Sequence, residues 1–154
     1  MKTACRIAMT VALVAASGPG AIARGAHTVP LKGSLDGTVV VSPQSPPFAF
    51  VVITASGNGT HVGHFTLQMP HLVNFATATG DGTFTLTAAN GDTLTGTFTG
   101  HADTSAPVFV IEETGTISGG TGRFASATGT IALHRLFDPA AGTTTGTIEG
   151  TLSF

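Results

Sequence analysis

The sequence predicts an all-β fold, a closed antiparallel β-barrel of eight or nine strands. The first observation behind this prediction is an alternation of apolar and polar residues with a period of two, which is typical of half-buried strands. The second is a set of short turn signals between the alternating segments, and the third is the absence of a 3.6-residue apolar period after residue 23. Frequent glycines within the strands favour the bends of a closed barrel over a flat sandwich.

The clearest element is a hairpin centred on Asn90-Gly91. Threonines occupy every second position on both sides of this pair, and the residues between them are apolar or glycine. Asn-Gly is the pair best suited to the positive φ angles of a two-residue hairpin turn. The sequence therefore predicts two paired strands, 83–88 and 93–100, with one threonine face and one apolar face.

The remaining strands follow the same alternation. They are expected at residues 31–41, 48–56, 60–69, 107–117, 129–137 and 143–153. Residues 71–79 are either a further strand or a continuation of the third strand past Pro70. The last two strands are joined by residues 138–142, where a proline followed by a glycine indicates a turn.

The first 23 residues predict a cleavable signal peptide. Lys2 and Arg6 supply the positive start, a ten-residue apolar run follows, and small residues precede the cut. We expect cleavage after Ala23, with Ala26 as the second choice, and a single barrel domain over residues 24–154. The apolar run is shorter than the roughly 20 residues that span a bilayer, so we expect a secreted or periplasmic protein without stable membrane insertion after cleavage.

The composition excludes several classes of function. The segment after residue 23 has four basic side chains against eight acidic ones, so it lacks the basic stripe that nucleic-acid binding requires. The chain's one cysteine, Cys5, lies within the signal peptide, so no disulfide is expected in the mature protein. The chain has no Trp or Tyr on which a sugar ring could stack. No cofactor is expected, and these patterns do not specify an oligomeric state.

Two motif-like patterns have simpler structural explanations. His61, His64 and His71 are of a metal-ligating type, but side chains three residues apart on a strand point to opposite faces, so no metal site is expected. The spacing Gly120-x-Gly122-x-x-Ala125 matches a dinucleotide-binding fingerprint. That motif binds pyrophosphate through the helix that follows it, and here a strand pattern follows.

Strand parity predicts three polar groups inside the barrel. His61, Glu113 and Arg135 each share a strand face with apolar neighbours at two-residue spacing. Because buried charges must be paired, we predict an internal ion pair between Glu113 and Arg135 with His61 nearby. These three residues are the candidate ligand-binding groups of the lumen. A purely structural pair, or a bulge that turns one of the residues outward, is the alternative.

A glycine-rich turn is expected at Gly119, Gly120, Gly122 and Phe124. We expect the phenyl ring of Phe124 to enter the core at this turn. We also expect Gly120 or Gly122 to adopt a backbone conformation that other residues reach only at a cost. Both expectations give these four residues a structural role.

Two stretches near the C-terminus carry a family resemblance. Residues 119–129, with the strand 130–134 that follows, resemble the glycine-rich turn and next strand of the allene oxide cyclase barrel family and of the related dirigent proteins. Residues 137–142 also resemble the dirigent pattern, and residues 60–65 resemble uncharacterised bacterial secreted members of this group. The resemblance implies a calycin-like, eight-stranded antiparallel barrel.

The resemblance does not carry an activity with it. The plant cyclase has Cys and Tyr in its lumen, which the mature chain lacks, and the dirigent catalytic acids have no motif-level counterpart here. The sequence therefore favours a secreted barrel that binds a small apolar ligand, or a non-catalytic extracellular module. A cyclase or isomerase of allene oxide cyclase or dirigent type is the alternative. A surface-interaction protein that uses its threonine face is a second alternative.

Overall fold

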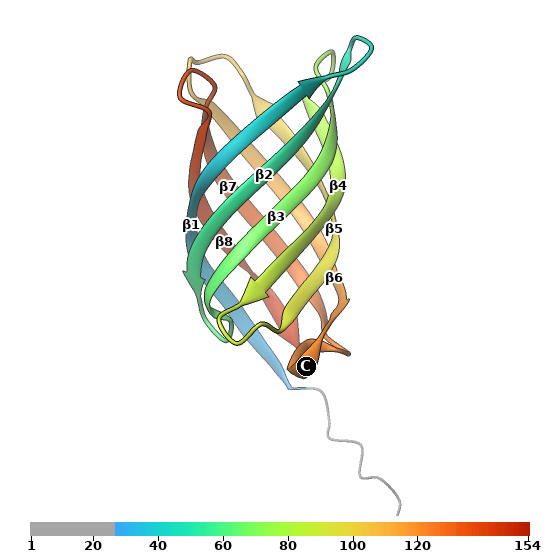
Figure 1. The fold of residues 1–154 in the computed structure, drawn as a ribbon, viewed down its shortest axis with the longest axis vertical. Helices are drawn as coiled ribbons and strands as arrows, with labels where there is room; N and C mark the ends of the chain where they lie inside the picture. Colours follow the sequence, from blue (N-terminus) through green and yellow to red (C-terminus); the bar gives the residue numbers. More distant parts are fainter. Residues whose placement is uncertain (1–26) are drawn as a thin grey trace, which may run out of the picture.

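The computed structural model describes residues 27–154, and the predicted signal peptide with its cleavage site lies outside the described residues. Eight strands form one closed barrel, in which each strand pairs antiparallel with the next and the last pairs back onto the first (Figure 1). The predicted fold class is confirmed. The strands are β1 (Thr28–Pro43), β2 (Phe48–Gly59), β3 (Gly63–Asn74), β4 (Thr79–Ala88), β5 (Thr93–Asp103), β6 (Phe109–Gly120), β7 (Thr128–Asp138) and β8 (Thr143–Ser153).

The segment around Pro70 determines the strand count. β3 continues through this proline to Asn74 and β4 begins at Thr79, so residues 71–79 do not form a ninth strand. Proline has no N–H to donate to a ladder, and the pairing of β3 with β4 skips Met69 and Pro70. The register is the same on both sides of the gap, so β3 stays in the sheet and its inward parity is unchanged.

The two ends of the barrel are built from different loops. Four loops join the strands at the end that we call the mouth, namely residues 44–47, 75–78, 104–108 and 139–142. The opposite end, which we call the closed end, contains the turns 60–62 and 89–92 and the segment 121–127 with a short 3₁₀ helix, η1 (Gly122–Phe124). The C-terminus lies at the closed end (Figure 1).

Strand alternation places large apolar side chains inside the barrel and most threonines outside it. Each fully buried Leu, Ile or Phe contributes roughly 1.5–3 kcal/mol relative to its exposed state. These side chains come mainly from the strand halves near the closed end, so the packed core fills that half of the barrel. The largest fully buried side chains are Leu31, Ile53, Phe65, Leu67, Met69, Leu86, Leu94, Ile117, Phe124, Leu133, Ile148 and Leu152.

Glycines on the inner wall provide the room for this core. Gly57 lies opposite Phe65 on the neighbouring strand, and Gly96 lies opposite Phe84. A Cβ added at either glycine would lie 2.7 Å from the phenyl ring of its partner. The rings therefore occupy the space that a side chain at these inward positions would need, which explains why glycine recurs inside the strands.

The segment 121–127 fills the closed end. Phe124 is fully buried, its ring meets that of Phe154 edge-on with centroids 5.2 Å apart, and the Arg123 guanidinium lies 4.5 Å from its centroid. Gly122 has φ of +57°, and the Asp92 carboxylate occupies the space that a Cβ would need. Asp92 Oδ2 accepts a hydrogen bond from the backbone N–H of Arg123 at 3.2 Å.

The two glycines before this segment end β6. A β-bulge between β5 and β6 lets β6 continue to Gly120, three residues beyond the end that the alternation predicts. Gly120 backs directly onto the carbonyl oxygen of Thr93, so no side chain fits there, and Gly119 has φ of +153°. Both positions are structural parts of the turn into η1.

Candidate functional site

A cavity of about 340 Å³ opens at the mouth and reaches down to the middle of the barrel. Its walls are mainly apolar and aromatic, and they include Val39, Val73, Phe109 and Phe137. Three ionisable side chains, His71, Glu113 and Arg135, line its inner end beside Phe98. The lumen is thus filled in the closed half and open in the mouth half.

Glu113 and Arg135 form a bidentate ion pair inside the barrel. Arg135 Nε donates to Glu113 Oε2 at 2.8 Å, and Arg135 Nη2 donates to Glu113 Oε1 at 2.6 Å. Both side chains are 2 % exposed. The ion pair expected from strand parity is therefore present, while a role in ligand binding stays a prediction.

A third contact completes the arrangement of Arg135. Its Nη1 donates to Thr144 Oγ1 at 3.0 Å, and that hydroxyl in turn donates to the carbonyl oxygen of Leu136 at 2.9 Å. Among residues 27–154, no fully buried side-chain nitrogen or oxygen lacks a hydrogen-bond partner. The guanidinium is consequently held in one orientation by two neighbouring strands, β6 and β8.

His71 is the third polar group of the cavity. Its Nδ1 lies 3.0 Å from the carbonyl oxygen of Met69, and because a carbonyl only accepts, Nδ1 carries the proton. The ring meets Phe98 edge-on with centroids 5.3 Å apart. Burial lowers the pKa of His71 below its usual value, which the Met69 hydrogen bond and the charge of Glu113 offset in part. The imidazole is therefore neutral at pH 7, with Nε2 as a hydrogen-bond acceptor.

The Nε2 atom of His71 is available to a ligand. Nε2 has no hydrogen-bond partner among the described residues. Every fully buried side-chain nitrogen or oxygen of these residues has a partner, so Nε2 is not fully buried and is exposed to the cavity that His71 lines. An acceptor nitrogen at the inner end of an apolar cavity favours a ligand that donates a hydrogen bond there.

A glycine on the adjacent strand faces each of these three polar side chains. Gly82 lies opposite His71, Gly100 opposite Glu113, and Gly146 opposite Arg135. A Cβ at these glycines would lie 2.5 Å from His71 Cβ, 2.6 Å from Glu113 Cγ and 2.8 Å from Arg135 Cγ. The inner wall is therefore shaped around the polar groups in the same way as around the phenyl rings.

The expectation that His61 lies beside the ion pair is wrong. His61 lies in the turn between β2 and β3, exposed and with φ of +64°, and β3 begins only at Gly63. Its carbonyl oxygen accepts a hydrogen bond from Arg123 Nη2 at 2.6 Å, at the closed end of the barrel. The turn breaks the two-residue period, so parity counted from within β3 does not extend back to residue 61.

The histidine that does lie beside the ion pair carried a recognisable signal in the sequence. His71 has the same parity as Phe65, Leu67 and Met69, all of which point inward. The sequence leaves open whether the third strand continues past Pro70, because proline is usually confined to strand edges, and the face on which His71 lies depends on that continuation. Once β3 is known to run through Pro70, the period of two places His71 inside.

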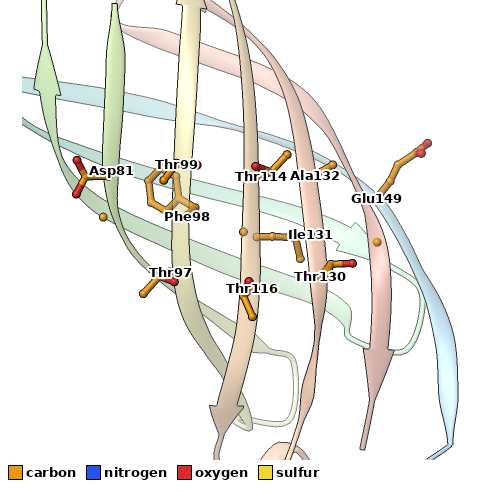
Figure 2. Close-up of a pocket in the computed structure, with 13 residues that line it drawn as sticks. Asp81, Thr97, Phe98, Thr99, Thr114, Thr116, Thr130, Ile131, Ala132 and Glu149 are labelled. Carbon is orange, nitrogen blue, oxygen red and sulfur yellow. The ribbon is translucent and has the colours of Figure 1, made fainter.

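A second, larger hollow of about 860 Å³ lies on the outer wall of β4–β8, and it is a shallow, open depression. Figure 2 shows threonines of neighbouring strands across it, with Asp81 and Glu149 at its two sides. Cross-strand pairs such as Thr97 with Thr116 and Thr116 with Thr130 form its middle row. This wall has no buried charge and no outward aromatic ring among its lining residues, so we place the candidate site in the mouth cavity. The role of the threonine face in interactions stays a prediction.

Two further properties concern the part of the chain that the structure describes. Residues 27–154 contain no group of three or more His, Cys, Asp or Glu side chains placed to hold a metal ion. His61 and His64 are exposed near the closed end, whereas His71 is buried in the cavity. Within the same range, no helix has the length and apolar character needed to cross a membrane.

Comparison with known proteins supports the fold. No protein-family model matches the chain, and no curated protein matches it significantly. A solved structure of a pterocarpan synthase dirigent protein is similar over 96 % of both chains, with a TM-score of 0.61 and 14 % sequence identity. The likeness shows that the chain folds as a dirigent-like eight-stranded barrel, as the resemblance in its glycine-rich turn implies.

Proposed function

We propose that this dirigent-like barrel binds one small, largely apolar molecule in its mouth cavity. The observation that carries the proposal is an apolar-walled cavity whose inner end presents the free Nε2 of a buried, neutral histidine, His71. A volume of about 340 Å³ is near the lower limit of small-molecule pockets, which span about 300–1,000 Å³. The ligand is accordingly about the size of a fused two-ring compound.

The polar groups define which end of the ligand enters first. A ligand with a hydroxyl or N–H can donate a hydrogen bond to Nε2 of His71. A purely apolar ligand removes water from Nε2 without giving it a partner, which costs free energy. The Glu113–Arg135 pair lies at the same end of the cavity and is fixed by Thr144. We therefore expect the ligand to carry a hydrogen-bond donor at one end and an apolar body toward the mouth.

A matched pair of probes tests this binding mode. The fluorescence of 1-naphthol, which has a hydroxyl donor, and of 1-methoxynaphthalene, which has none, reports binding in titrations of the mature protein. We expect tighter binding of 1-naphthol, and we expect His71→Phe to remove most of that preference, a change of about fivefold for one net hydrogen bond.

The control for this experiment is Thr97→Val on the outer wall, which should leave both affinities unchanged. Failure of both probes to bind would contradict the proposal. A preference for 1-naphthol that survives His71→Phe would show that His71 does not read the donor.

A second candidate function is isomerisation or cyclisation of the bound molecule. One observation favours it: His71 Nδ1 donates to Met69, so its basic Nε2 is directed to the ligand in a fixed orientation, as a general base requires. The similar solved structure is that of a pterocarpan synthase dirigent protein.

The deuterium exchange of the acidic CH₂ of 2-tetralone, followed by NMR in D₂O, tests whether His71 acts as such a general base. We expect the protein to accelerate exchange and His71→Phe to abolish the acceleration while 1-methoxynaphthalene still binds.

Export of the barrel belongs to the same proposal. The charged start, the apolar run and the small residues before Ala23 support secretion. We expect N-terminal sequencing of protein from the medium or periplasm to begin at Arg24. Recovery of the intact chain from Met1 in a membrane pellet would contradict export by a cleaved signal.

A further inference from the structure

Large exposed apolar side chains are concentrated at one end of the barrel. Among residues 27–154, ten large apolar side chains are exposed, and nine of them lie in the mouth loops or in the last four strand residues next to the mouth. The tenth, Phe154, lies at the closed end against Phe124. We call the nine the collar: Val40, Val41, Phe48, Phe50, Leu72, Phe75, Val108, Val110 and Leu136.

The mouth loops themselves carry almost no charge. Their residues are mainly Pro, Ala, Ser, Thr, Phe and Val, with no Lys or Arg in any of the four. Two carboxylates border them, at Asp103 and Asp138. Asp103 Oδ1 accepts from the backbone N–H of Ser105 at 2.9 Å, and Asp138 Oδ1 accepts from that of Ala140 at 2.9 Å, so both are engaged within their own turns.

The closed end is different in kind. Its turns contain polar residues that hydrogen bonds connect. Asn90 Nδ2 donates to Asp92 Oδ2 within one turn, and Arg123 donates to Asp92 and to the His61 carbonyl oxygen in the two other turns. The gathering of the four uncharged loops at one end follows from the connectivity, because alternate loops of an eight-stranded up-and-down barrel lie at the same end (Figure 1). A general excess of surface apolar residues would have appeared at both ends.

The collar is continuous with the cavity. Val41 and Phe75 are exposed at the rim and also line the cavity, so apolar surface extends from the outer wall over the rim to the inside. All the strands except β4, β5 and β8 contribute to the collar or its loops. The collar residues on β1–β3 and those on β6–β7 lie on two different flanks of the opening, so a surface that contacts the whole rim covers both groups, whereas a partner bound to one flank covers only one of them.

We propose that the mouth end docks on a lipid bilayer with uncharged, zwitterionic headgroups. The charge distribution favours such a surface over an anionic one, because the mouth loops and the last four strand residues beside them contain four carboxylates at the surface, those of Asp81, Asp103, Glu112 and Asp138, and no exposed Lys or Arg. Hydrogen bonds from Ser105 hold the pKa of Asp103 below its usual value, so this carboxylate stays charged at neutral pH. Docking places the cavity opening against the phase in which small apolar molecules dissolve, and this last step rests on the proposed ligand binding.

Flotation of the mature protein with phosphatidylcholine vesicles tests the docking. We expect the protein to float with the vesicles equally at about 0.1 and 1 M NaCl, since apolar contact is not screened by salt. The double variant Val40→Asp/Val108→Asp changes two exposed collar residues outside the cavity, on β1 and in the loop 104–108. We expect it to lower the vesicle partition coefficient at least about tenfold, because each buried apolar side chain contributes severalfold to affinity.

The matched control is Ala89→Asp/Ala125→Asp, which adds the same charge at exposed positions of the closed end and should float like the unchanged protein. Circular dichroism and retained 1-naphthol binding show that both double variants are folded. If the unchanged protein floats with the vesicles but binds neither 1-naphthol nor 1-methoxynaphthalene, the proposed function is contradicted and docking stands.

Three outcomes would overturn the docking proposal. The first is the absence of flotation with phosphatidylcholine vesicles. The second is flotation only with anionic vesicles and its loss in 1 M NaCl. The third is self-association in analytical ultracentrifugation that Val40→Asp/Val108→Asp abolishes, without vesicle binding, which would make the collar an interface between copies of this chain.

Discussion

At the scale of single residues, Glu113 and Arg135 show how a charge is kept inside an apolar barrel. Two short hydrogen bonds join them, and Thr144 takes a third N–H of the guanidinium. Removing one partner leaves the other charge buried without compensation, which typically costs about 3–5 kcal/mol. Replacing both by apolar groups of similar size is often nearly neutral.

We therefore expect Glu113→Met and Arg135→Met each to destabilise the barrel markedly in urea unfolding, and the double variant, in which both side chains are apolar, to recover much of the loss. The double variant also separates structure from function. If it is stable and loses 1-naphthol binding, the pair serves the ligand. If it keeps both stability and binding, the pair is structural. Near-normal stability of the two single variants would contradict the expected cost of breaking the ion pair.

His71 gives the barrel a dependence on pH. Burial lowers its pKa in the folded state below the ordinary value of 6.5, so the unfolded chain takes up this proton more readily. The contribution to stability is complete above about pH 6.5 and is lost as the pH falls toward the folded pKa. We expect the free energy of unfolding to fall below about pH 6.5, and His71→Phe to remove that part of the slope.

The matched control for His71 is His64→Gln, because His64 is exposed on the outer face of β3. It should keep the pH dependence of the unchanged protein in urea titrations over the same range. An identical slope in His71→Phe and in the unchanged protein would mean that another group is responsible.

At the scale of elements, an inward glycine on one strand is matched to a large side chain on the adjacent strand. Gly100 on β5 faces Glu113 on β6, and a Cβ there would lie 2.6 Å from Glu113 Cγ. We expect Gly100→Ala to cost about 1–3 kcal/mol in urea unfolding through this overlap, and to cost less in a Glu113→Ala background, where the space is free. Thr99→Ala, the outward neighbour, is the control and should show no such coupling.

The segment 121–127 is the other element whose packing is testable. Phe124 is fully buried against Phe154, so Phe124→Ala removes contacts and leaves a cavity, at a cost of about 3–5 kcal/mol. Urea titration measures this directly, with Ser126→Ala at an exposed position of the same segment as the control. A loss below about 1 kcal/mol would show that the ring contributes little to the closed end.

Strand parity explains both what the sequence predicted and where it failed. Glu113 and Arg135 lie in the interior of uninterrupted strands, so a period of two was sufficient to place them inside. The prediction for His61 failed because residues 60–62 form a turn, in which His61 itself has a positive φ, and β3 begins only at Gly63. His71 was missed because Pro70 resembles a strand end, although the ladder merely skips it.

At the scale of the whole molecule, the barrel divides into a packed half and an open half. The number of strands decides which loops share an end, since one additional strand after Pro70 would move every later loop to the opposite end. The apolar composition of the four mouth loops is visible in the sequence, but their gathering around one opening follows only from a count of eight. The open lumen depends on distances across the barrel, which periodicity along one strand does not contain.

The pairing of β1 with β8 brings the two ends of the described chain together at the closed end. Thr28 pairs with Ser153, and their side-chain hydroxyls are 2.6 Å apart. A short linker between these residues, with new termini opened at the Asn90-Gly91 turn, gives a circular permutant that keeps all eight strand pairings. The native and the permuted termini both lie at the closed end. A bead, fusion partner or anchor attached to either form therefore holds the barrel with its mouth directed away from the attachment point.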